Sequence, residues 1–380
     1  MMRIRRRKIK WVVLLLMLFL LAGCVNAEET PQSAAMTSTP DMDYVETHPT
    51  EIVPVQETSG LVFTNAEGTW WINWAGELEL LTAYGQAQVS PDGTLLAYTA
   101  DGSGSYLGDI WLESIDDGER INLTNTPDRD ETMPIWLAVR PQILLFGSGQ
   151  DSGLANSRYP TTINLDGSDY EVLDSNEGGL RGASPEGDWF FYGWSDAVLQ
   201  TYAWETGTGR FDPAAYGLEV EKLFQPEWSP DGRYVAFFVA GEFDSMQAPG
   251  LAIAVFDLEA QTANIMHAYT PLGGAMFNNE LAWSPDGAWL AFTTTAEPPA
   301  SGRTPNLWVI RPDGGEEHYL GAGSAPVWRY DSSLLAFQGL NENQTEEVYL
   351  VERGSWSARR VEGLFPERIL FLMDWLDPAR

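Results

Sequence analysis

The sequence predicts an all-β fold, a β-propeller of seven four-stranded antiparallel blades, with six blades as the alternative count. Three observations predict it. A motif based on Trp-Ser-Pro-Asp-Gly recurs along the chain, and short strand-like segments follow each copy. The two ends of the domain carry complementary fragments of one further repeat. A repeat length in the middle forties with strand-like flanks is typical of propeller blades.

The recurring motif has two complete copies, at residues 228–232 and 283–287. Copies without the Trp begin at Ser90 and Ser184. The remaining copies are degenerate and keep only part of the motif. Aligned on the second position, all copies fall at 90, 137, 184, 229, 284, 329 and 376. Because the Trp side chains hold equivalent positions in the repeats, we expect them to pack between neighbouring blades. They are Trp136, Trp228, Trp283, Trp328 and Trp375.

Each repeat contains four predicted strands, as residues 280–320 illustrate. The strands are expected at 280–283, 289–293, 306–310 and 317–320. Ser-Pro-Asp-Gly joins the first two, since Pro presets the turn backbone and Gly accepts the left-handed angle. Pro-Asp-Gly-Gly forms a hairpin turn between the last two. The same order of strands and turns recurs in the other copies.

The two ends of the domain predict how the ring closes. Residues 61–84 hold three strands without a first one, at 61–64, 69–72 and 79–82. Residues 370–375 hold a first strand without the other three. We expect these fragments to share one blade, which removes the exposed sheet edges of an open array.

The repeat resembles that of the TolB-like β-propeller family. The resemblance rests on Trp-Ser-Pro-Asp-Gly followed by a Leu-Ala-Phe type strand, as at 283–287 and 290–292, and it extends over residues 61–380. It implies the propeller fold and leaves the binding partner open.

The first residues predict export and lipid anchoring. A basic segment at residues 3–10 precedes a twelve-residue hydrophobic segment at 11–22. Twelve residues is a typical length for the hydrophobic core of a signal peptide. Leu21-Ala22-Gly23-Cys24 resembles the bacterial lipobox, and Cys24 is the only Cys in the chain. We therefore predict a signal peptide at 1–23, lipidation of Cys24, and a location in the bacterial cell envelope, on its periplasmic or cell-surface side.

Residues 24–60 differ in composition from the rest of the chain. They are rich in Thr, Pro, Glu, Ser and Ala and have no apolar period. Such a segment buries too little surface to offset its chain entropy. We interpret 24–60 as a flexible tether and 61–380 as the propeller domain.

The charge of the chain excludes some partners. The net charge is −32, and removal of the six basic residues of the signal peptide leaves 16 basic against 54 acidic residues, a net charge of −38. This charge repels nucleic acid and anionic membrane surfaces. We expect a monomer whose only membrane contact is the lipid at Cys24.

The predicted binding surface is the face that carries the longest loops. Strands alternate in direction, so the segments between second and third strands share one face with the links between blades. These segments are long, and long loops on a rigid scaffold often carry function. They span 101–108, 147–160, 241–250, 297–305 and 339–346. The candidate binding residues on this face are Arg129, Glu131, Arg158, Tyr159, Arg181, Gln225, Asn279 and Glu280.

We expect no cofactor, metal or catalytic residue. The chain has three His residues, His48, His267 and His318, and no His or Cys cluster typical of a transition-metal site. Residues 128–131 lack the spacing of a calcium loop. Ser195 lacks the strand-to-helix elbow that a hydrolase nucleophile needs.

Three functional hypotheses follow. The first is a binding or scaffolding module for a protein, peptide or glycan. The second is a carbohydrate- or peptide-active enzyme that uses carboxylates at the channel mouth. A group of two or three carboxylates with raised pKa values at one mouth would favour the enzyme, and an open mouth ringed by aromatic and uncharged polar groups would favour the binding module. The third is one module of an assembly whose catalytic partner is a separate chain.

Overall fold

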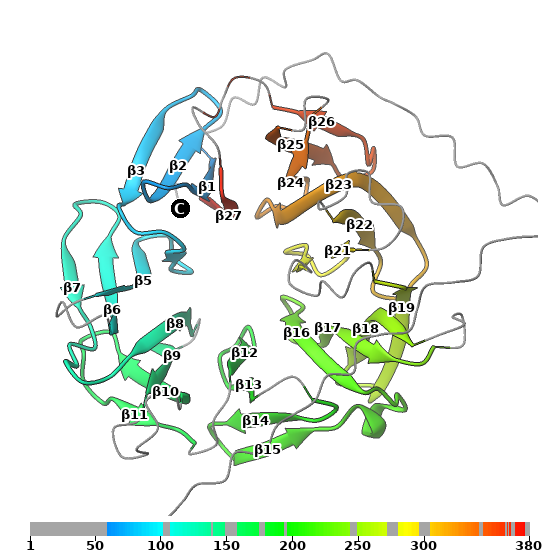
Figure 1. Ribbon diagram of the computed structural model, residues 1–380, viewed down its shortest axis with the longest axis horizontal. Coiled ribbons are helices and arrows are strands. Elements are labelled where there is room, and N and C mark those ends of the chain that lie inside the picture. Colours follow the sequence, from blue (N-terminus) through cyan, green and yellow to red (C-terminus); the bar gives the residue numbers. More distant parts are fainter. Residues whose placement is uncertain are drawn as a thin grey trace, which may run out of the picture. The chain divides into compact units, whose positions relative to one another are not determined.

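The computed structural model consists of antiparallel β-sheets that follow one another around a ring (Figure 1). It describes residues 59–101, 107–137, 140–148, 158–174, 179–193, 196–243, 249–271, 280–295, 305–341, 345–361, 363, 365 and 369–376. Within this part of the chain no helix is long and apolar enough to cross a membrane. The predicted signal peptide, Cys24, the tether and Ser195 lie outside the described residues.

The first three sheets each have four strands. The first contains β27 (Phe371–Leu376), β1 (Gly60–Thr64), β2 (Thr69–Asn73) and β3 (Leu78–Thr82). The second contains β4 (Gln88–Val89), β5 (Leu95–Asp101), β6 (Gly108–Ser114) and β7 (Arg120–Asn122). The third contains β8 (Glu131–Trp136), β9 (Gln142–Ser148), β10 (Arg158–Asn164) and β11 (Glu171–Val172).

Two further four-stranded sheets and one larger sheet complete the described part. The fourth sheet contains β12 (Gly179–Ala183), β13 (Trp189–Gly193), β14 (Leu199–Ala203) and β15 (Gly207–Phe211), and a 3₁₀ helix follows at Pro213–Tyr216. The fifth contains β16 (Lys222–Trp228), β17 (Tyr234–Gly241), β18 (Gly250–Asp257) and β19 (Thr262–Tyr269). The sixth contains β20 (Leu281–Trp283), β21 (Leu290–Thr294), β22 (Asn306–Ile310), β23 (Glu317–Trp328), β24 (Leu334–Leu340), β25 (Glu346–Glu352) and β26 (Ala358–Arg360).

The predicted number of blades is wrong. Five of the described sheets are four-stranded blades, so neither seven such blades nor the alternative of six is present. The remaining two repeats merge into one seven-stranded sheet because β23 runs for 12 residues without a break. It pairs with β22 over its first half and with β24 over its second. Sequence reasoning expected a link between two strands here, but the segment is too short to leave the sheet.

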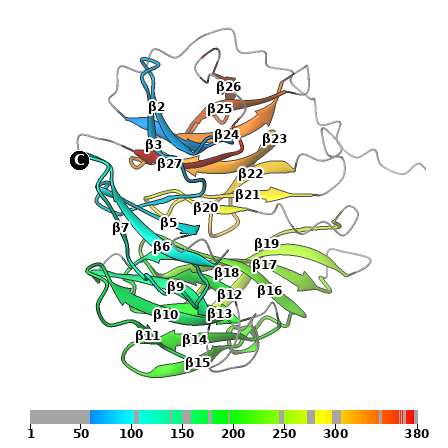
Figure 2. The same ribbon diagram turned by 60° about the vertical axis from the view of Figure 1, so that its left-hand side comes forward.

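The predicted pairing of the two chain ends is present. β27 pairs antiparallel with β1, and Trp375 lies opposite Leu61. Figures 1 and 2 show the red β27 beside the blue strands of the same sheet. The indole Nε1 of Trp71 also donates a 3.4 Å hydrogen bond to the carbonyl of Leu376. Strands from both ends of the domain therefore form one blade.

The Ser-Pro-Asp-Gly turns are held by their own side chains. Ser229 Oγ donates to Asp231 Oδ1 at 2.5 Å and accepts the backbone N–H of Tyr234 at 2.8 Å. Gly232 takes a left-handed φ of 71°, which a residue with a Cβ rarely adopts. These turns define one side of the sheets, which we name the turn face. The opposite side, with the segments between second and third strands, is the long-loop face.

The repeated Trp residues join neighbouring repeats. In four of the five, the indole Nε1 donates to a backbone carbonyl in the first strand of the preceding repeat, at 3.0 to 3.1 Å. The pairs are Trp136 with Gln88, Trp283 with Glu227, Trp328 with Ala282, and Trp375 with Val327. The predicted packing between blades is confirmed for the last three, which are 7% exposed. Trp136 is half-buried.

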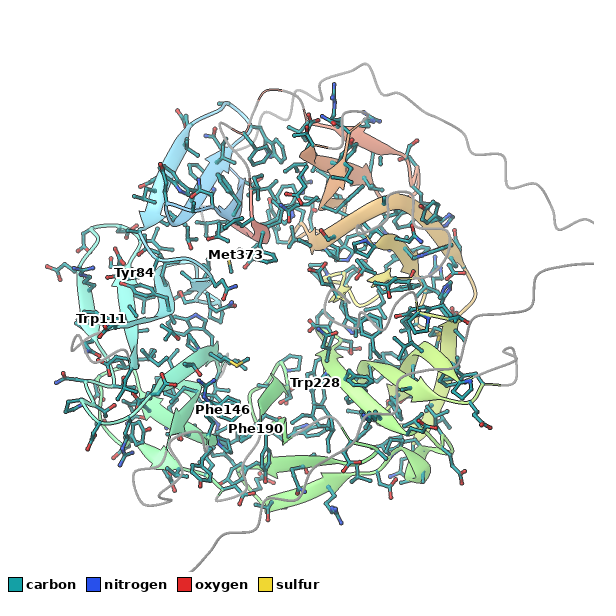
Figure 3. All side chains as sticks on the ribbon, viewed as in Figure 1. Tyr84, Trp111, Phe146, Phe190, Trp228 and Met373 are labelled. Carbon is teal, nitrogen blue, oxygen red and sulfur yellow. The ribbon has the colours of Figure 1, made fainter. Side chains whose placement is uncertain are left out.

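Trp228 is the exception among these indoles. It is buried and packs against Trp189 and Phe191, with ring centroids 4.3 and 5.4 Å away. Its Nε1 has no hydrogen-bond partner among the described residues. Figure 3 shows Trp228 with Phe146 and Phe190, and the latter two share one apolar cluster between the third and fourth sheets. Aromatic side chains thus fill the spaces between sheets.

The difference between Trp283 and Trp228 gives a test of the indole hydrogen bond. Trp283→Phe removes packing and the bond to the Glu227 carbonyl, whereas Trp228→Phe removes packing and an unpartnered N–H. We expect Trp283→Phe to lower the free energy of unfolding by about 1 kcal/mol more than Trp228→Phe does. Urea unfolding of both variants measures this, and equal losses would show that the bond contributes nothing.

Candidate functional site

The long-loop face is described only in part. Residues 102–106, 149–157, 244–248, 297–304 and 342–344 of its loops lie outside the described residues. The ends of these loops and the links between repeats remain, and they include several of the predicted binding residues.

A buried carboxylate organises the described part of this face. Glu131, the first residue of β8, is fully buried, and both its oxygens accept from Thr126 Oγ1, at 2.7 and 2.6 Å. Tyr170 donates its hydroxyl to Glu131 Oε1 at 3.1 Å. Burial raises the pKa of Glu131, and the hydrogen bonds from Thr126 and Tyr170 offset this rise only in part. We name Thr126, Arg129, Glu131 and Tyr170 the Glu131 cluster.

Gly147 provides the space for this arrangement. It pairs directly opposite Glu131 across β8 and β9. A Cβ at Gly147 would lie 2.2 Å from the Tyr170 hydroxyl oxygen, which is far inside contact distance. The absent side chain therefore lets the Tyr170 hydroxyl reach the carboxylate.

Of the predicted arginines, Arg129 belongs to the Glu131 cluster and Arg158 contacts the neighbouring Asp130. The guanidinium of Arg129 lies 4.8 Å from the centre of the Tyr170 ring. Arg158 NH2 forms a 2.9 Å ion pair with Asp130 Oδ2, and Asp130 Oδ1 accepts the backbone N–H of Gly108 at 2.9 Å. Hydrogen bonds and ring contacts therefore hold both cations in place near the ends of the loops.

The structure brings together three of the eight predicted residues. Arg129 and Glu131 share Tyr170, and Arg158 joins them through the neighbouring Asp130. Tyr159 follows Arg158 in β10, opposite Gly147. Sequence reasoning missed Tyr170, Thr126 and Gly147. A short-range signal existed only for Thr126, five residues before Glu131.

Gln225, Glu280 and Arg181 lie on or beside innermost strands. Gln225 is exposed in a bulge of β16, with a left-handed φ of 46°. Glu280 accepts the backbone N–H of Ala325 and donates its own N–H to Thr293 Oγ1 at 2.8 Å, so it ties the loop before β20 to β23. Burial raises the pKa of Glu280. Arg181 lies in β12, and Asn279 lies outside the described residues.

Two carboxylates that the sequence did not single out stand directly before repeated Trp residues. They are Glu227 in β16 and Asp374 in β27. Desolvation by the surrounding protein raises the pKa of both carboxyl groups. Both side chains are nevertheless exposed, so water that reaches them reduces this desolvation.

The carboxylates of the innermost strands do not form a pair. The seven-stranded sheet separates β16 from β27 in the order of the sheets. Among the described residues, no hydrogen bond joins any two of Glu227, Glu280 and Asp374, and desolvation rather than a neighbouring carboxylate raises the pKa of each. The described residues also contain no group of three or more His, Cys, Asp or Glu side chains that could hold a metal ion.

Known structures share the fold. No protein-family model and no curated protein sequence matches the chain. A crystal structure of puromycin hydrolase aligns with a TM-score of 0.55 at 15% identity, over 82% of this chain and 54% of that chain. A puromycin-hydrolyzing peptidase of Mycobacterium tuberculosis aligns with a TM-score of 0.52 at 12% identity, over 81% and 54%. TolB from Acinetobacter baumannii aligns with a TM-score of 0.47 at 14% identity, over 68% and 62%.

These similarities show an all-β propeller with four-stranded blades. The chain spans about half the length of the two hydrolases and 62% of the TolB chain. Identities of 12 to 15% show the fold alone, and the lower similarity to TolB adds nothing to that conclusion.

The space at Gly147 is testable by a double-mutant cycle. Gly147→Ala would force the Tyr170 hydroxyl away from Glu131, and we expect it to cost about 1 to 3 kcal/mol of stability. In a Tyr170→Phe background, which lacks that hydroxyl, the same change should cost less. Urea unfolding of the four proteins measures the coupling. Additive losses would contradict the packing described.

The raised pKa of Glu131 predicts a pH dependence. A carboxyl whose pKa is higher in the folded state stabilises the protein below its ordinary value of 4.5, and this stability is lost as the pH rises through the folded-state pKa. Glu131→Gln removes the titration, so we expect its stability relative to wild type to increase from about pH 4.5 to neutrality. Denaturant unfolding at several pH values measures this trend.

The control for that experiment is Glu119→Gln, which removes one negative charge at an exposed position. A difference between Glu131→Gln and wild type that stays constant with pH, or that changes as it does for Glu119→Gln, would contradict the prediction.

Proposed function

We propose that this chain is an exported, lipid-anchored propeller of the bacterial cell envelope that binds a protein, peptide or glycan through its long-loop face. In this proposal residues 1–23 are a signal peptide, Cys24 carries the lipid, and 24–60 tether the propeller at 61–380. The basic segment, the hydrophobic segment and the lipobox-like Leu-Ala-Gly-Cys support export and anchoring. The resemblance of the repeats to the TolB-like family supports an extracytoplasmic location.

The observation that supports the binding role is that two arginines on the long-loop face have defined partners. Arg158 is held by Asp130, and Arg129 by the ring of Tyr170, next to a buried carboxylate. Pre-organised side chains lose little entropy when a partner binds. In a chain of net charge −32, these two cations offer a partner specific contacts on a generally acidic surface.

The position of the first strand supports an orientation. Gly60 begins β1 opposite Leu376, at the end of β27 that corresponds to the turn face. β1 therefore begins on the turn face, the side of the sheets opposite the proposed binding face.

The alternative is an enzyme that uses carboxylates on the innermost strands. The raised pKa values of Glu227 and Asp374 favour it, because a raised pKa makes a carboxyl group a better general acid, although exposure of both side chains reduces this effect. Desolvation raises the pKa of each, and neither carboxyl group acts on the pKa of the other, which favours the binding module because glycoside hydrolysis needs two carboxyl groups that lie close together. A module of an assembly with a separate catalytic chain fits the same binding face.

Affinity capture from solubilised envelopes tests the binding role. The full-length protein serves as bait, with Arg129→Ala and Arg158→Ala variants and with Arg359→Ala as the control on β26. We expect one stoichiometric partner that the first two variants lose and the control retains. Equal capture of the partner by all three variants would show that the partner does not bind through Arg129 and Arg158, and would contradict binding at the long-loop face. Capture of no partner, together with turnover of a glycan or peptide panel, would favour the enzyme.

The anchor is tested separately. Cys24→Ser removes the only thiol that a lipid could modify, so we expect the protein to leave the membrane fraction and to lose labelling by a fatty-acid analogue. Fractionation and in-gel detection of the label measure this. Unchanged membrane association and labelling would exclude Cys24 as the anchor.

A further inference from the structure

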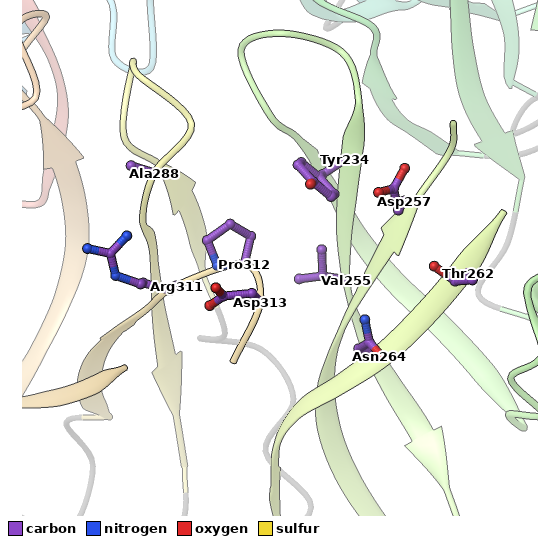
Figure 4. Close-up of a pocket in the computed structure, with 9 residues that line it drawn as sticks. All are labelled: Tyr234, Val255, Asp257, Thr262, Asn264, Ala288, Arg311, Pro312 and Asp313. Atoms are coloured by element: carbon purple, nitrogen blue, oxygen red, sulfur yellow. The ribbon is translucent and has the colours of Figure 1, made fainter. Parts of the chain in front are cut away.

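A polar pocket lies on the turn face, between the fifth and sixth sheets (Figure 4). Its volume is about 280 Å³. Residues of β17, β18 and β19 line one side, and Ala288 and the turn after β22 line the other. None of the predicted binding residues lines this pocket, so it is distinct from the long-loop face.

Several hydrogen-bonding groups in this pocket are unused. Among the described residues, no hydrogen bond engages the hydroxyl of Tyr234, the hydroxyl of Thr262 or the side-chain amide of Asn264. Asp313 accepts the N–H of Gly315 with one carboxylate oxygen, at 2.9 Å, and leaves the other oxygen free. Hydroxyl and amide groups both donate and accept, so together these side chains suit a ligand that does the same.

Most of the charges around the pocket are already paired. Asp257 Oδ2 lies 2.7 Å from Arg233 NH2, and Arg311 Nε lies 3.2 Å from Glu316 Oε2. The guanidinium of Arg311 also lies 4.9 Å from the centre of the Trp289 ring. Of the charged residues that line the pocket, Asp313 alone has no ion-pair partner in the described part of the chain, so the pocket offers a carboxylate acceptor and no unpaired cation for an anionic ligand.

Packing holds the Tyr234 side of the pocket in place, and part of the pocket lining is apolar. Arg233 covers the Tyr234 ring at 4.9 Å, and Trp283 stacks on it at 6.2 Å between ring centroids. Tyr234 therefore presents a positioned hydroxyl to the pocket. Val255 and Pro312 add apolar surface for the C–H groups of a ligand.

We propose that this pocket binds one neutral saccharide unit, a hexose or N-acetylhexosamine. Its volume is just below the range of about 300 to 1,000 Å³ typical of drug-sized ligands, so it suits a single sugar ring. Sugar hydroxyls match the unused donors and acceptors, and the C–H face of the ring matches the apolar wall. The site lies on the turn face, on the opposite side of the sheets from the long-loop face.

The test uses the full-length protein in a detergent without a sugar headgroup. Glucose, galactose and N-acetylglucosamine are the neutral probes, and glucuronate is the charged comparison. Titration calorimetry and saturation-transfer NMR measure binding, and we expect a dissociation constant on the order of millimolar for a neutral sugar. Tyr234→Phe and Thr262→Ala should each weaken binding about three- to tenfold.

Thr208→Ala is the matched control, because Thr208 is also exposed on an outermost strand but lies outside the pocket. It should bind as wild type does, and so should Arg158→Ala, which separates this site from the long-loop face. Thermal unfolding confirms that each variant is folded. The proposal is overturned by the absence of binding to any neutral sugar, by tighter binding of glucuronate, or by unchanged binding in both pocket variants.

Discussion

The architecture depends on the contact between each repeated indole and the repeat before it. Trp283, Trp328 and Trp375 each bury a large ring between neighbouring repeats and donate to a carbonyl of the preceding innermost strand. Burial of the ring supplies the hydrophobic stabilisation, and the directed bond fixes how far the two strands are offset. Each acceptor carbonyl belongs to a residue that is itself paired with the second strand of its sheet, so the indole bond links the ring of one repeat to the ladder of the repeat before it.

The same constraint positions the side chains that matter for function. Trp283 fixes β20 against the preceding sheet, and Glu280, just before β20, then reaches the N–H of Ala325 in β23. In the third sheet, the pairing of Glu131 with Gly147 leaves room for Tyr170. The sheets thus determine where the ends of the loops lie. The loops themselves can differ in sequence and length while the arrangement of the sheets stays the same.

Sequence reasoning predicted the strands, the shared sheet of the two ends and the packing of the indoles, because each leaves a local and periodic signal. It missed the continuity of β23, since a strand that serves two repeats looks like two strands with a short link. The sequence pattern pointed to Arg129 and Glu131 but not to Tyr170. Tyr170 lies 39 residues from Glu131 in the sequence, and only the pairing of the strands brings the two side chains together. Sequence reasoning also missed Glu227, because a lone exposed carboxylate has no distinguishing pattern.

The shared sheet has a consequence for how the chain matures. Trp71 and Leu376, which contact each other there, are 305 residues apart in the sequence. Closing so long a loop is entropically costly and slow, so this sheet is expected to be among the last parts to assemble. Until β27 arrives, the edge of β1 offers unpaired backbone groups to any other strand. A folding chain therefore passes through an aggregation-prone stage before β27 pairs with β1.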